Sequence, residues 1–224
     1  MLSNHTILSF AAFACLMHPC VAAEPHADLL EKLNRLSPLP RIAPDIKQSV
    51  IASLPTEGEV RTLTPADHSK LESVALVLKL HGRDADYLFK VVESSQARVA
   101  IHGRFVVLVT DTALRLLTRS QLQALVAHEI GHEYVWEEYE DARKRNDWRR
   151  VRELELFCDG VAVQTLVRIG AASSSLIDAL RIMTASDQRN GFVPDPTRDS
   201  HPSLVERARF SKELAKRLAK KVAR

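Results

Sequence analysis

The spacing of apolar residues along the chain predicts a domain that is mainly helical. The clearest helical stripe consists of Leu122, Leu125, Val126 and Ile130. These positions recur every three or four residues, which places them on one face of a helix. Ser120 and Gln123 have the spacing of a capping box, so we expect this helix to begin at Ser120. The middle of the chain therefore holds a strongly patterned helix with a buried face.

Other segments complete an expected α+β fold that is mainly helical, with a small sheet packed on the central helix. Further helices are expected at about residues 27–36, 64–81, 112–117, 149–169, 174–185 and 203–224. Extended segments are expected at residues 87–92 and on both sides of His102 and Gly103, the second at residues 105–109. The charged stretch at residues 137–153 is either a solvated helical extension or a mobile loop. A loop rich in Pro, Asp and Gly is expected at residues 187–200.

The first 23 residues differ in character from the rest of the chain. Residues 7–17 are apolar but too short to span a bilayer, and small residues follow at 21–23. We expect residues 1–23 to be a cleaved signal peptide, so that the mature chain begins at Glu24. A retained anchor and lipid attachment at Cys15 are the alternatives.

Prolines punctuate the next segment, residues 24–60. After a first short helix, a wrapped arm or linker is expected from Pro38, Pro40, Pro44 and Pro55. The alternative is that residues 24–60 are a pro-segment that covers an active site. Residues 61–224 then form a single domain. Cys158 is the one cysteine after residue 23, so no disulfide within the mature chain is expected.

Composition excludes some functions and leaves others open. Among the 224 residues, 46% are hydrophobic and 26% are charged, and the formal net charge is +3. Nothing in this balance indicates a nucleic-acid binder, and no apolar run after residue 23 reaches the roughly 18 residues that span a bilayer. The last helix is basic. Its apolar stripe favours packing on the core, and peripheral contact with a membrane surface is the alternative.

The segment AHEIGHEY, residues 127–134, carries the candidate chemistry. His128 and His132 are four residues apart, so their side chains project from the same face of a helix. This spacing allows both imidazoles to bind one zinc ion at about 2.0–2.1 Å. Glu129 lies beside the first histidine, where it can accept a proton from water without being a ligand. Solvated residues on an ordinary helix are the alternative interpretation.

The later segment ELELFCDG supplies a candidate third ligand. A hydrolytic zinc site needs three protein ligands and an open position. Glu155 fits the third ligand, and Asp159 lies one helical turn further on, where it can orient a ligand histidine, which we expect to be His128. Glu153 is the rival ligand, and ligation by Cys158 ranks below both. The apolar neighbours of Glu155 and Asp159 favour a functional interpretation over a solvated face.

Three ordered motifs give the chain a resemblance to a known family. These are the HEIGH segment, the Glu155-to-Asp159 spacing, and DSHPSLVERAR with His201, Pro202 and Arg207. Together they resemble the zinc metallopeptidase family of the HtpX heat-shock protease and the CAAX prenyl endopeptidases, within the gluzincins. The resemblance covers roughly residues 65–210 and implies a zincin-like metallopeptidase domain with an edge strand beside the active-site helix.

The resemblance implies roles for individual residues. It implies one zinc ion held by His128, His132 and Glu155, with Glu129 as catalytic base and proton donor. His201 would stabilise the oxyanion, and Arg207 would brace the site near the ligand carboxylates. Two features depart from the family: many relatives have membrane-spanning helices, and a small residue is usual at the position of Cys158.

The sequence thus predicts a zinc-dependent endopeptidase that hydrolyses exported or envelope proteins. Its partner would be an extended polypeptide, which the strand near residues 98–101 could pair with. A non-proteolytic chaperone or envelope-assembly factor with a structural zinc ion is the alternative from another class. The signal peptide and the resemblance together favour a bacterial periplasm, with secretion or a lipid anchor as alternatives.

Overall fold

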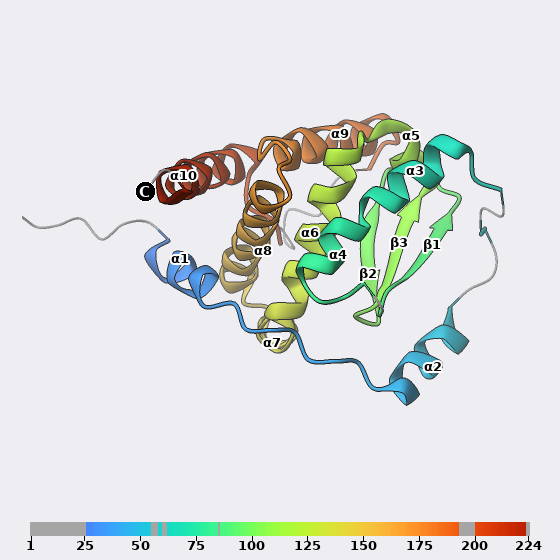
Figure 1. The fold of residues 1–224 in the computed structure, drawn as a ribbon, viewed down its shortest axis with the longest axis horizontal. Coiled ribbons are helices and arrows are strands. Elements are labelled where there is room, and N and C mark those ends of the chain that lie inside the picture. The colour runs from blue at the N-terminus through green and yellow to red at the C-terminus, as the bar shows by residue number, and fades with distance from the viewer. Residues whose placement is uncertain (1–25, 55–57, 60–61, 85, 193–199, 223–224) are drawn as a thin grey trace, which may run out of the picture.

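The computed structural model describes residues 26–54, 58–59, 62–84, 86–192 and 200–222, so the predictions for residues 1–23 lie outside them. The fold is α+β and mainly helical, with one small sheet among the described residues (Figure 1). The elements are α1 (Ala27–Asn34), α2 (Pro44–Ser53), α3 (Pro65–Ser73), α4 (Ala75–Leu80), β1 (Leu88–Val92), β2 (Val99–His102), β3 (Val106–Thr110), α5 (Asp111–Leu116), α6 (Arg119–Tyr134), α7 (Trp136–Lys144), α8 (Trp148–Arg168), α9 (Ser175–Arg189) and α10 (Leu204–Val222).

The sheet has the strand order β1-β3-β2, which makes β2 an edge strand. β3 pairs in parallel with β1 and antiparallel with β2. The central strand is mostly β-branched and buried, as expected for a strand with neighbours on both sides. Gly103, at a φ of 57°, sits in the turn between β2 and β3, as the sequence predicts. Its absent side chain also leaves room for Val50 of α2.

Helix α6 lies between the edge strand β2 and the long helix α8 (Figure 1). The predicted stripe is buried: Leu122, Leu125, Val126 and Ile130 are all at most 3% exposed. The predicted start at Ser120 was wrong. Thr118 caps the helix and exchanges hydrogen bonds with Gln121, because these two residues have the same capping-box spacing. Gln123 is instead buried and donates to the carbonyl of Ser73 at 2.7 Å.

Other local predictions need correction. Residues 44–53 form a helix rather than a proline-broken arm, because Pro44 occupies its first turn, where no N–H partner is needed. Residues 64–81 form two helices, α3 and α4, that join at Val74, although Thr64 caps the first as expected. The stretch at 137–153 is mainly helical and not a loop, although it does not continue α6. It contains the separate helix α7 and the start of α8.

The N-terminal arm is tied to the domain by polar contacts. Lys32 of α1 forms an ion pair with Glu138 of α7. The guanidinium of Arg83 is fully buried, donates to the carbonyl of Pro40 at 2.8 Å and pairs with Glu133 of α6 at 2.6 Å. A buried charge of this kind is tolerated only with a partner. The arm therefore helps to complete the structure around α6 and α7.

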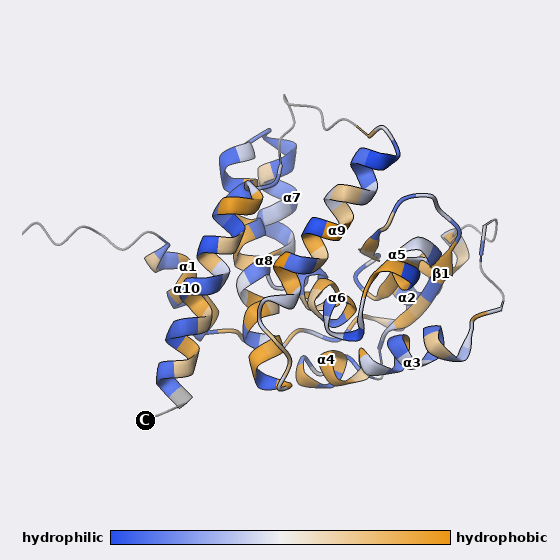
Figure 2. Ribbon diagram, turned by 90° about the horizontal axis from the view of Figure 1, so that it is seen from above, coloured by the Kyte–Doolittle hydropathy of each residue, from blue (hydrophilic) through white to orange (hydrophobic). Residues whose placement is uncertain are grey.

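Helix α10 is amphipathic, with apolar and polar positions alternating along it (Figure 2). Phe210 and Leu214 are buried, and the helix packs on α8 and α9. Lys220 and Lys221 are exposed. Within the described part of the chain, no helix is long and apolar enough to cross a membrane. Of the expected apolar stripe at Leu214, Leu218 and Val222, Leu214 is buried and Leu218 packs against the core, and membrane contact stays a prediction.

Helices α6 and α8 approach each other closely at Gly131. A Cβ atom built there would lie 2.7 Å from the Cα atom of Cys158. This distance is below van der Waals contact, so the backbones could not stay this close with any other residue at position 131. The glycine of HEIGH therefore sets the separation of the two helices that carry the candidate ligands.

We expect Gly131→Ala to lower the free energy of unfolding by about 2 kcal/mol, the cost typical of overpacking a core. This loss outweighs the smaller gain in helix propensity from alanine. Urea unfolding followed by circular dichroism measures it. Gly160→Ala is the matched control on α8, because its added Cβ meets only the end of the flexible Leu33 side chain. Equal stability of the two variants would contradict the close approach.

Candidate active site

The two histidines of the HEIGH segment lie one turn apart on α6, with Glu129 between them. One candidate ligand atom from each of His128, Glu129 and His132 lies within 4.8 Å of the other two. The rings of His128 and His132 meet edge to face, with their centroids 5.1 Å apart. This group could hold a metal ion.

Helix α8 adds the carboxylates that were expected from the sequence. Glu155 is 1% exposed, and its Oε2 lies 3.3 Å from Nε2 of His128 while its Oε1 lies 3.7 Å from Nε2 of His132. Asp159 is fully buried, and its Oδ1 lies 3.0 Å from Nδ1 of His128, the contact predicted for it. Both residues thus face α6 from adjacent turns of α8.

One distance in the cluster matches the spacing of two ligand atoms around a tetrahedral cation. Two ligand atoms bound at about 2.0–2.1 Å in a tetrahedron are separated by roughly 3.3–3.4 Å. The 3.3 Å between His128 Nε2 and Glu155 Oε2 agrees with this value. Oε2 of Glu155 is also buried without a hydrogen-bond partner. Such an oxygen is costly unless a cation lies beside it, and either a protonated His128 or a bound metal ion supplies that charge, so the donor set fits a metal ion.

Arg207 reaches the site from α10. Its guanidinium is 4% exposed and donates two hydrogen bonds to Asp159, at 2.6 and 2.8 Å. Burial alone would raise the pKa of Asp159, but Arg207 and His128 hold it below its usual value. Arg207 therefore braces Asp159, the partner of His128, rather than Glu155.

The electrostatics distinguish the two histidines. Burial opposes the charged form of His128, but Asp159 and Glu155 outweigh it and raise its pKa to about 9. Burial lowers the pKa of His132 to about 4, so this ring is neutral at pH 7 and has a free lone pair. The position beside His128 thus favours positive charge, which either a proton or a metal cation can supply.

The two glutamates also differ. Burial raises the pKa of Glu129 to about 7, against the opposing effect of His128. Burial acts on Glu155 in the same direction, but the neighbouring His128 and His132 lower its pKa below the usual range. Oε2 of Glu129 also accepts a hydrogen bond from the backbone N–H of Ile101 at 3.3 Å. Glu155 is therefore the ionised carboxylate, and Glu129 is the one poised to exchange a proton near neutral pH.

The remaining candidates from the sequence occupy distinct places. His201 lies at the rim, with its side chain 59% exposed and its Nε2 3.8 Å from Oε1 of Glu155. Glu153 pairs with Arg149 and Arg150 and does not join the cluster, so the rival ligand is excluded by position. Sγ of Cys158 lies 3.5 Å from Nδ1 of His132, the ring nitrogen opposite the one that faces Glu155.

A cleft of about 220 Å³ opens beside the cluster. It is lined by Ile101 of β2, by Glu129, His132 and Glu133 of α6, and by Trp136, Tyr139, Glu140 and Arg143 of α7. The α7 wall of the cleft was not predicted from the sequence. The spacing of Trp136, Tyr139 and Arg143 on one helical face was the available signal. Residues 26–54 contribute nothing to this lining, and the pro-segment hypothesis for residues 24–60 stays a prediction.

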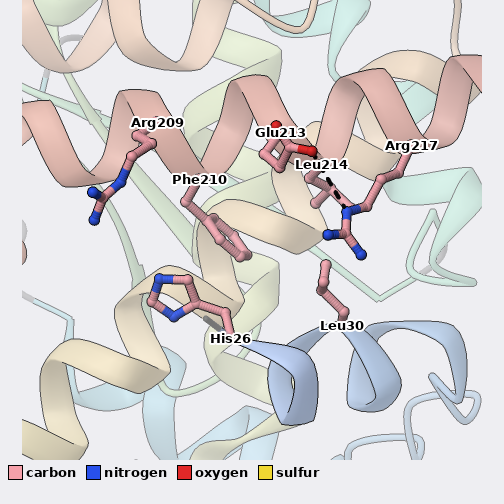
Figure 3. Close-up of a pocket in the computed structure, with 7 residues that line it drawn as sticks. All are labelled: His26, Leu30, Arg209, Phe210, Glu213, Leu214 and Arg217. Atoms are coloured by element: carbon pink, nitrogen blue, oxygen red, sulfur yellow. Dashed lines mark ion pairs between the residues drawn. The ribbon is translucent and has the colours of Figure 1, made fainter. Parts of the chain in front are cut away.

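A second groove lies apart from this cluster, between α1 and α10. It is larger and more apolar, and it is lined by His26, Leu30, Arg209, Phe210, Glu213, Leu214 and Arg217 (Figure 3). The ring of His26 packs edge to face on Phe210, and Glu213 pairs with Arg217. No residue of the His-Glu-His group lines it. The smaller cleft, which contains Glu129, is therefore the place for chemistry.

In comparisons with known proteins, no family model matches the chain and no curated protein matches it significantly. The class of site is therefore defined by its geometry: a partly buried cluster of two histidines and two glutamates, braced by an Asp–Arg pair, at the edge of a cleft.

Proposed function

We propose that the protein is a zinc-dependent endopeptidase with a zincin-like fold, related to the HtpX and CAAX prenyl endopeptidase family. The observation that supports this most directly is the buried Oε2 of Glu155, which has no hydrogen-bond partner and lies 3.3 Å from Nε2 of His128. The three motifs of the resemblance support it further, because their residues converge on one point. Export to a periplasm belongs to the same proposal.

His128, His132 and Glu155 would hold the zinc ion. Zinc, when bound, would supply Lewis-acid activation of water and of the scissile carbonyl. Glu129 does not serve as a ligand in this proposal. It takes a proton from the attacking water and passes it to the leaving amine, which suits a carboxyl group whose pKa is raised to about 7. His201, exposed at the rim, is placed to meet the developing oxyanion.

The free edge of β2 would align an extended polypeptide. Among the strands that the structure describes, β2 pairs only with β3, and the N–H of Ile101 points away from β3 toward Glu129. Ile101 also lines the cleft. A substrate strand that adds to this edge gains backbone hydrogen bonds and passes directly by the proposed base. The proposed substrate class is therefore an unfolded or extended segment of protein.

The experiment that tests the function is casein digestion by the purified protein, before and after removal of metal with a chelator. We expect cleavage to stop on metal removal and to return when zinc is added back, because the water is activated only with the ion bound. Added magnesium is the control, since a site of two histidines and one carboxylate prefers zinc. Cleavage that persists in the metal-free protein would contradict the proposal.

A further inference from the structure

Tyr139 is not part of any motif in the sequence, yet it contacts the centre of the site. Its hydroxyl donates to Oε1 of Glu155 at 2.8 Å. Its ring also packs edge to face on His132, with centroids 4.7 Å apart. The residue lies on α7 and forms part of the cleft wall. Tyr139 of α7 therefore touches two of the three candidate ligands.

Each candidate ligand has one polar atom in contact with a supporting side chain. Nδ1 of His128 is held by Asp159 at 3.0 Å, and Nδ1 of His132 lies 3.5 Å from Sγ of Cys158. Oε1 of Glu155 is held by Tyr139, whereas its Oε2 has no hydrogen-bond partner. Tyr139 thus completes a set of three supporting contacts, one for each candidate ligand.

The position of α7 is itself fixed. Glu138, the neighbour of Tyr139, pairs with Lys32 of α1 and with Arg150 of α8, the latter at 2.7 Å. Ala142 is buried against the domain on the same helix. These contacts hold α7 from its outer side, so the hydroxyl of Tyr139 meets Glu155 in a defined geometry.

We propose that Tyr139 is a positioning residue that makes Glu155 a ligand through one oxygen only. Oε1 lies 3.7 Å from Nε2 of His132 and is held by the phenol, whereas Oε2 lies 3.3 Å from Nε2 of His128 and has no hydrogen-bond partner. A carboxylate with both oxygens free binds a cation through either one or both. Restriction to one oxygen keeps the coordination number low and leaves a position open for water, as hydrolytic zinc sites require. This inference rests on the zinc site of the proposed function.

The test compares Tyr139→Phe with Tyr134→Phe in the full chain. Tyr134 is the matched control, because its hydroxyl lies 2.8 Å from Nδ1 of His81 and not beside the candidate ligands. Zinc affinity is measured by competition with a chelator. We expect Tyr139→Phe to raise the zinc dissociation constant about 10-fold, the usual effect of losing an outer partner of a ligand, and Tyr134→Phe to leave it unchanged.

Cobalt gives a second readout that a general loss of stability would not produce. The visible absorption of bound Co²⁺ weakens as its coordination number rises. We expect Tyr139→Phe to weaken this absorption at saturating cobalt, because Oε1 becomes free to bind. An unchanged spectrum together with unchanged zinc affinity would overturn the role of Tyr139. If the wild-type protein bound zinc but cut no protein, the proposed function would fail while this inference stood.

Discussion

Replacement of Glu129 by Gln should abolish hydrolysis while leaving the metal in place. Loss of a general base typically slows a reaction by about 10²–10⁴-fold. We expect the rate of casein cleavage to decrease by a factor in that range. The amide has the shape of the carboxyl group but cannot take the proton from water. The N–H of Ile101 donates to Oε2 of Glu129 at 3.3 Å. The glutamine side chain also has an oxygen that can accept this hydrogen bond, so the local fold is preserved.

The measurement records cleavage rate and zinc content on the same preparations. Glu140→Gln is the matched control, because Glu140 lines the same cleft but lies outside the His-Glu-His group. It should cleave at close to the wild-type rate. Hydrolysis that survives Glu129→Gln would remove Glu129 from its role and favour another base. Loss of zinc from this variant would instead make Glu129 a ligand.

Replacement of Glu155 by Ala should remove the metal itself. The change deletes the buried carboxylate that lies 3.3 Å from His128 and 3.7 Å from His132. Two histidines alone leave a zinc ion short of the three protein ligands that catalytic sites use. We expect zinc to be lost on dialysis and hydrolysis to be lost with it. Elemental analysis of the dialysed protein measures the outcome.

Glu153→Ala provides the matched control for this variant. Glu153 is two residues away on the same helix, but its carboxylate pairs with Arg149 and Arg150. Its removal should leave the zinc content unchanged and cost little stability, since exposed ion pairs contribute about 0–1 kcal/mol. Zinc retained in Glu155→Ala would show that another group, such as Glu129, completes the site.

Local sequence patterns were enough to locate most of the secondary structure and the residues of the cluster. The apolar stripe of α6 and the four-residue spacings of His128 with His132 and of Glu155 with Asp159 follow from helical periodicity alone. Capping also depends on local spacing. The start of α6 was nevertheless misplaced, because Thr118 and Ser120 both precede a glutamine by three residues. Choosing between them required the buried contact of Gln123 with Ser73.

The pairing between helices was decided by tertiary structure. Gly131 permits α6 and α8 to approach closely, which brings the carboxylates of α8 to the histidines of α6. Arg207 comes from α10, and its partner is Asp159 rather than Glu155 because of where that helix crosses α8. Glu153 and Glu155 were both candidates in the sequence, and only Glu155 faces inward.

Helix α7 shows the difference between what the sequence pattern predicts and what packing between helices decides. Its charged sequence indicated a solvated segment or a loop, and Tyr139 had no motif to distinguish it. The packing of α7 on α8 turns Tyr139 toward Glu155 and makes the helix a wall of the cleft. The sequence by itself determined which residue types stand one helical turn apart. The tertiary structure decided which of them meet, because contacts between helices depend on packing across the core rather than on spacing along the chain.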